Sequence, residues 1–122
     1  MPGNLTTYGA DAFFNGEAMP LVQFVKGHVG NPGPDALANV AAEDRRFSIG
    51  IASIGGGQAI NSLGSLSGAT AIEEWTHLTL WDDGTVGNPW WVAELPAPLP
   101  IAIGETIRLV DGLLVLTFVL WS

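Results

Sequence analysis

The segment Trp75-Thr76-His77-Leu78-Thr79-Leu80-Trp81 decides the fold class of this chain. Its residues alternate as in a β-strand, with both tryptophans on one face and both leucines on the other. The acidic and glycine-containing segment 82–88 follows and predicts a turn, and residues 90–95 have the pattern of a returning strand. The segment therefore predicts an antiparallel hairpin with a long loop.

Further strands are predicted on both sides of this hairpin, at residues 20–26, 47–54, 105–110 and 113–121. The last of them is apolar on both faces, which is typical of a strand that is covered on both sides. Prolines at positions 96, 98 and 100 predict an extended connector without ladder pairing, because proline has no amide donor. The Gly/Ser-rich segment 62–70 is predicted to be irregular.

The N-terminal residues 4–15 have the pattern of a short helix, with Asn4 or Thr6 as its cap and Asn15-Gly16 as its end. Residues 20–121 would form the β domain. The prediction for the whole chain, residues 1–122, is one all-β domain, a β-sandwich or a flattened barrel with a short N-terminal α-helix.

Composition excludes several classes of function. The formal net charge is −8, and the basic residues Lys26, Arg45, Arg46 and Arg108 are too few and too scattered for a phosphate-binding patch, so we expect no nucleic-acid partner. The chain has no cysteine and therefore no disulfide or thiolate chemistry. Neither end has the pattern of a secretory signal or a membrane-spanning helix, so we expect a protein made in the host cytoplasm without membrane contact.

No combination of residues indicates catalysis. His28 and His77 are the only histidines, and neither belongs to a motif with metal-ligand spacing. The pairs Glu73-Glu74 and Asp82-Asp83 are adjacent in sequence, so on a strand their carboxylates would point to opposite faces instead of converging. We expect no catalytic residue, no metal and no cofactor, and hence no enzyme.

The Gly/Pro-rich segment 28–44 predicts a long surface loop, and such loops in small domains often have a binding role. The two arginines that follow the segment could pair with acidic groups of a partner. The residues predicted to contact that partner are Asn31, Pro32, Gly33, Pro34, Asp35, Arg45 and Arg46.

Aromatic and apolar residues exceed what one core layer can take. Trp90 and Trp91 are adjacent, so on a strand they face opposite ways. The N-terminal helix, the long loop or another chain must cover the second face. On the last interpretation, aromatic enrichment at interfaces predicts an oligomer contact made by Trp90, Trp91, Val119 and Trp121.

The order of several short motifs points to a family. In the first half these are Phe24-Val25-Lys26-Gly27-His28-Val29-Gly30-Asn31-Pro32-Gly33, Ala38-Asn39-Val40 and Arg45-Arg46-Phe47. In the second half they are Trp75-Thr76-His77-Leu78-Thr79-Leu80-Trp81-Asp82, Gly87-Asn88-Pro89-Trp90-Trp91, Gly104-Glu105-Thr106 and Gly112-Leu113-Leu114-Val115-Leu116-Thr117. In this order the chain resembles a family of small virion structural proteins of tailed bacteriophages.

The resemblance implies a structural role without a cofactor, in one of two places. Members are described as capsid decoration (cement) proteins or as tail proteins. The first implies a homotrimer on the outer capsid surface that binds the major capsid protein and stabilises the head. The alternative is a tail-tip or fibre-associated protein that binds a host receptor or a carbohydrate through exposed residues Trp81, Trp90 and Trp91.

Overall fold

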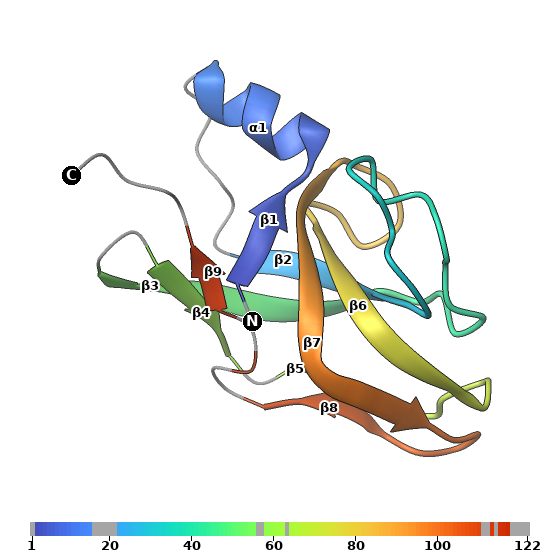
Figure 1. The fold of residues 1–122 in the computed structure, drawn as a ribbon. Helices are drawn as coiled ribbons and strands as arrows, with labels where there is room; N and C mark the ends of the chain where they lie inside the picture. The colour runs from blue at the N-terminus through green and yellow to red at the C-terminus, as the bar shows by residue number, and fades with distance from the viewer. Residues whose placement is uncertain are drawn as a thin grey trace.

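The computed structural model describes residues 2–15, 22–55, 58–62, 64–110, 113 and 115–117. These residues form strands and one short helix, in agreement with the predicted all-β class (Figure 1). The elements in chain order are β1 (Pro2–Leu5), α1 (Thr7–Phe14), β2 (Val22–His28), β3 (Phe47–Gly55), β4 (Gln58–Asn61), β5 (Gly64–Leu66), β6 (Glu73–Trp81), β7 (Pro89–Ile101), β8 (Ile107–Leu109) and β9 (Val115–Thr117).

Of the two predicted architectures, the chain adopts the barrel. The described strands close in the order β1-β7-β6-β2-β3-β4-β9, and β9 returns to β1 as the parallel pair of the barrel. Strands β5 and β8 form a separate two-stranded sheet. Closure gives each barrel strand a neighbour on both sides over at least part of its length, which leaves few free sheet edges in the barrel.

The predicted hairpin is present as β6 and β7, which pair antiparallel with Leu78 opposite Ala93 and Leu80 opposite Trp91. The strict alternation is interrupted, however. The register shifts between Trp75 and His77, and this irregularity turns Trp75 into the core beside the leucines. Trp75 and Trp81 therefore lie on opposite faces, not on one face as predicted.

The proline-containing connector is in fact part of a strand, because β7 continues to Ile101. It tolerates the prolines for two reasons. Pairing with β6 is interrupted between the Trp75–Leu99 and His77–Glu94 partners, and β1 pairs only with residues 91–93 of β7. The prolines, which have no amide donor, therefore lie at positions where at least one side of β7 has no paired strand.

The segment predicted to be irregular contains β5, which pairs with β8. Here Gly64 is required by close packing, since a Cβ atom at this position would lie 2.1 Å from Cγ2 of Ile49. From the sequence alone, a glycine that allows two strands to pack closely cannot be distinguished from a glycine in a loop, and for this reason the segment was predicted to be irregular.

The helix lies inside the predicted span but is shorter, because residues 2–5 pair as β1. Thr6 caps the helix: its Oγ1 accepts a hydrogen bond from the amide of Gly9 at 3.0 Å. Its own amide donates to the carbonyl of Trp90 at 2.9 Å and ties the start of α1 to β7.

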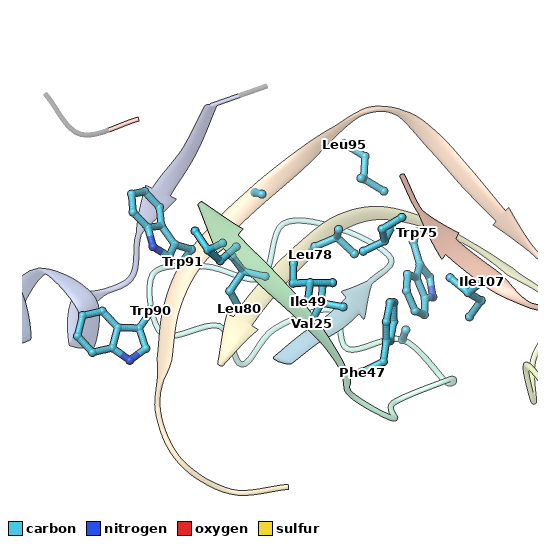
Figure 2. Packing of buried hydrophobic residues seen from close by; sticks show 14 of the residues in the cluster. Val25, Phe47, Ile49, Trp75, Leu78, Leu80, Trp90, Trp91, Leu95 and Ile107 are labelled. Atoms are coloured by element: carbon cyan, nitrogen blue, oxygen red, sulfur yellow. The ribbon is translucent and has the colours of Figure 1, made fainter. Parts of the chain in front are cut away.

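The core runs through the barrel and ends in two aromatic groups (Figure 2). At one end the ring of Trp75 stacks on that of Phe47, with centroids 6.4 Å apart, and Ile107 lies beside them. Trp90 and Trp91 lie toward the other end, next to Leu80 in the view of Figure 2.

Candidate functional site

A second packed layer forms on the outer surface of the barrel, where β2 and β6 pair. Phe24 is opposite Trp81 and Lys26 is opposite Thr79, and cross-strand partners lie on the same face of a sheet. Trp81 is only 7% exposed although it points away from the barrel core. It is therefore a buried aromatic floor beneath the polar residues of this face.

A hollow of about 470 Å³ beside this floor brings together three of the four basic residues of the chain. They come from β2 and from the loop before β3, and β5 and the turn after β6 complete the wall. The lining residues are Lys26, Asp44, Arg45, Arg46, Leu66, Gly84 and Thr85. The expectation that the basic residues are scattered is therefore wrong for these three, and we name this feature the basic hollow.

Arg46 is held in place by an aromatic ring and by a turn. Its guanidinium lies 3.9 Å from the ring centroid of Trp81, at cation–π distance. Its Nη1 donates to the carbonyls of Asp83 at 2.9 Å and Val86 at 2.6 Å. The 82–88 turn is thereby fixed against the loop that carries Arg46.

Lys26 has fewer polar contacts than the two arginines. Its ammonium lies 5.8 Å from the ring centroid of Trp81, and among the described residues it has no hydrogen-bond or ion-pair partner. Burial, followed by the nearby positive charge of Arg46, holds the pKa of Lys26 below its usual value, and Asp44 only partly opposes this. Burial also lowers the pKa of Arg46. Two like charges are therefore partly desolvated side by side.

Arg45 is positioned by a buried carboxylate. Its Nε and Nη2 donate to the two oxygens of Glu43 at 2.8 and 3.1 Å, and Nη2 also donates to the carbonyl of Gly68 at 2.7 Å. Glu43 is 1% exposed and accepts two further bonds, from the amide and the hydroxyl of Thr70. The hydrogen bonds from Arg45, and then those from Thr70, lower the pKa of Glu43 to about 2.

The same stretch of loop is also clamped by β6. The two carboxylate oxygens of Glu73 accept the amides of Ala42 and Glu43, each at 2.9 Å. A pair of buried or half-buried carboxylates thus anchors the backbone that presents Arg45 and Arg46. Neither acidic residue was expected to have this function, since carboxylates adjacent to other acidic residues usually indicate solvated charge.

The predicted contact residues of the long loop lie in a different place. Asn31, Gly33 and Pro34 line a smaller hollow of about 270 Å³, together with Leu5 and Val92. Pro32 is buried and Asp35 is exposed. Because Arg45 and Arg46 line the basic hollow instead, the predicted set is divided between two sites.

The two adjacent tryptophans are covered by the chain itself. Trp90 is 4% and Trp91 is 1% exposed, and both belong to the core cluster. The ring of Tyr8 in α1 meets that of Trp90 edge-on, with centroids 5.5 Å apart. Both tryptophans are therefore buried within the chain, Trp90 against the helix, and the oligomer contact stays a prediction with little exposed area at these two residues. Val119 and Trp121 lie outside the described residues.

The tryptophan side chains are too deeply buried to form the predicted carbohydrate-binding surface. Trp75, Trp81, Trp90 and Trp91 are all at most 7% exposed. The expectation that exposed residues Trp81, Trp90 and Trp91 stack on a sugar is therefore wrong.

His28 anchors the long loop rather than a metal. Its Nδ1 lies 2.9 Å from the carbonyl of Ala38, to which it donates, and its Nε2 lies 2.8 Å from Oγ1 of Thr79. The indole of Trp81 donates to the same Oγ1 at 2.8 Å, which leaves the hydroxyl proton for His28 Nε2. This chain of bonds requires the neutral imidazole.

We therefore expect protonation of His28 to weaken the fold. Burial is the main reason why its pKa lies below the usual 6.5, and Lys26 and His77 add to the effect. Because the folded state binds this proton less readily, the stabilisation is complete above about pH 6.5 and is lost as the pH falls through the lower folded-state pKa. His28→Gln should cost about 2 kcal/mol at neutral pH and flatten the slope of stability against pH below 6.5. Urea unfolding of both proteins at a series of pH values measures this, and parallel slopes would contradict it.

The described residues contain neither a metal-binding cluster nor a membrane-spanning helix. Among residues 2–15, 22–55, 58–62, 64–110, 113 and 115–117, no group of three His, Cys, Asp or Glu side chains gathers where it could hold a metal ion. In the same part of the chain, no helix has the length and apolar character needed to cross a bilayer.

Comparison with known proteins assigns the chain to a family. Residues 5–117 match the family described as podophage GP4 fiber I protein gp80. The chain belongs to this family. The resemblance to virion structural proteins of tailed phages is thereby confirmed, and the match extends from the last residue of β1 to the end of β9, including every residue of the basic hollow. No curated protein matches the chain.

Proposed function

We propose that this protein is a non-enzymatic structural component of a phage fibre. The family match over residues 5–117 carries the proposal, because its description names a fibre protein. The closed barrel supports it: a protein repeated at high local density in a particle benefits from having few open sheet edges, because open edges can pair with neighbouring chains. The loop clamped by Glu43 and Glu73 also gives the barrel a rigid outer surface.

The capsid cement role is the second candidate. It rests on the motif order, which also resembles decoration proteins that bind the major capsid protein at the outer capsid surface. The homotrimer stays a prediction of that resemblance. Its sequence argument loses Trp90 and Trp91, which are buried under the chain's own helix.

The number of copies per particle separates the two roles. A fibre at symmetric positions should contribute roughly three to a few tens of copies, in multiples of one ring, whereas a lattice decoration contributes on the order of hundreds. Quantitative mass spectrometry of purified particles, with the major capsid protein as internal standard, gives this number. A fibre count with antibody labelling on appendages supports the proposal. A count in the hundreds would replace it by the cement role, and absence from particles would reject both.

A further inference from the structure

The basic hollow is unusual in a chain with a formal net charge of −8. Three of the four basic residues line it, and they meet from segments that are separated in the sequence. Lys26 and Arg46 both approach the ring of Trp81, at 5.8 and 3.9 Å from its centroid. Carboxylates already offset part of this charge, since Glu43 pairs with Arg45, Asp44 acts on Lys26, and Asp82 and Asp83 act on Arg46. Lys26 has no ion-pair partner among the described residues, and a like charge in a partly buried place is stabilised by an anionic ligand.

Several donors remain available there. Lys26 makes no hydrogen bond to any described residue, so none of these residues occupies its three N–H groups. Arg45 uses Nε and Nη2, and Arg46 uses Nη1. Nη1 of Arg45, together with Nε and Nη2 of Arg46, makes no hydrogen bond to the described residues. Guanidinium and ammonium groups are the usual partners of carboxylate and phosphate oxygens.

The remaining lining residues narrow the choice of ligand. Asp44 and Thr85 add a carboxylate and a hydroxyl to the wall, and both can accept hydrogen bonds from hydroxyl groups. A simple carboxylate without hydroxyl groups would leave both acceptors unused. The space of about 470 Å³ also exceeds what one carboxylate or phosphate needs and lies in the range of small-molecule sites.

We propose that the basic hollow binds an acidic sugar unit, with its anionic group at Lys26, Arg45 and Arg46 and its hydroxyls at Asp44 and Thr85. This site differs from the exposed-tryptophan platform in that charge and hydrogen bonds, not ring stacking, hold the sugar. It goes beyond the structural role proposed above and is tested on the purified protein, so its failure leaves the particle count unaffected.

Binding is measured by the shifts of backbone amide signals during NMR titration with glucuronic acid. We expect saturable, weak binding with a Kd of about 1 mM, with shifts concentrated in residues 44–46 and 84–86. Glucose, which lacks the charge, and cyclohexanecarboxylate, which has the single charge but lacks the hydroxyls, should each bind at least about tenfold more weakly, a difference of about 1.4 kcal/mol.

Lys26→Gln and Arg108→Gln form a matched pair, because each removes one positive charge. Lys26 lines the hollow, whereas Arg108 lies exposed on β8 and does not. Lys26→Gln should weaken glucuronate binding at least about tenfold and Arg108→Gln by less than about twofold, whereas Lys26→Arg should restore most of the affinity. Amide spectra of the three variants show whether each is folded.

Several results would overturn the proposal. One is that glucuronate shows no saturable binding up to tens of millimolar. Another is that Lys26→Gln and Arg108→Gln lose the same affinity for glucuronate. Equal affinity for inorganic phosphate would reduce the hollow to a general anion site. Tighter binding of a glutamate-rich peptide would make it a protein contact instead.

Discussion

Gly27→Ala is expected to destabilise the protein by about 3 kcal/mol, although it adds only one methyl group. A Cβ atom at position 27 would lie 2.2 Å from two ring carbons of Trp75. The indole cannot move aside, since Trp75 is fully buried and stacks on Phe47. Either the ring or the β2–β6 pairing must shift, and overpacking of this kind is costly in a dense core.

Gly84→Ala is the matched control, because the same methyl group there would meet only Phe24 at 3.5 Å, an ordinary contact. We expect its free energy of unfolding to stay within about 0.5 kcal/mol of the wild type. Urea unfolding followed by tryptophan fluorescence measures both. A double variant, Gly27→Ala with Trp75→Leu, should lose less stability than the sum of the two single changes, since the smaller side chain relieves the clash. Additive losses would contradict the steric explanation.

Glu43→Gln is expected to cost about 3 kcal/mol at neutral pH. The carboxylate is 1% exposed and accepts four hydrogen bonds, two from Arg45 and two from Thr70. An amide of the same size replaces one accepting oxygen by an NH₂ group, which would face donors. The loop carrying Arg45 and Arg46 would lose one of its two carboxylate anchors, so glucuronate binding in the basic hollow should weaken as well.

The effect of this substitution should depend on pH. The pKa of Glu43 lies at about 2 in the folded state against its usual 4.5, so the folded state binds the proton less readily than the unfolded one. The carboxylate therefore stabilises the fold fully above about pH 4.5, and this contribution is lost as the pH falls toward 2. Wild type and Glu43→Gln should converge in stability over that window. The exposed Glu94→Gln is the control for replacing a carboxylate by an amide at the surface. A constant difference between wild type and Glu43→Gln would contradict this account.

Much of the architecture follows from local sequence patterns. Alternation over residues 75–81, a polar turn and the returning residues 90–95 predicted a hairpin that the structure contains as β6 and β7. The helix was predicted for a similar reason, because capping by Thr6 acts within one turn of the chain. In both cases the signal and the structure lie within a few residues of each other.

The errors have a common cause, which is the influence of distant neighbours. Trp75 leaves the alternating pattern because β7 is irregular opposite it, and Gly64 is in a strand because Ile49 approaches it. The prolines of β7 are tolerated because β1 ends early along that strand. None of these partners is visible from the segment itself.

The sequence by itself determined the all-β class, the central hairpin and the kinship with phage structural proteins, since short motifs carry all three. Only the tertiary structure decided where the chemistry lies. It placed Lys26 opposite Thr79, set Arg46 on Trp81 and enclosed Glu43, thereby bringing scattered charges into one hollow. It also buried Trp90 beneath Tyr8 of the helix. The physical reason is that strand register and loop packing are long-range: each depends on which residues meet after the barrel closes, whereas periodicity and turn signals depend only on neighbours along the chain.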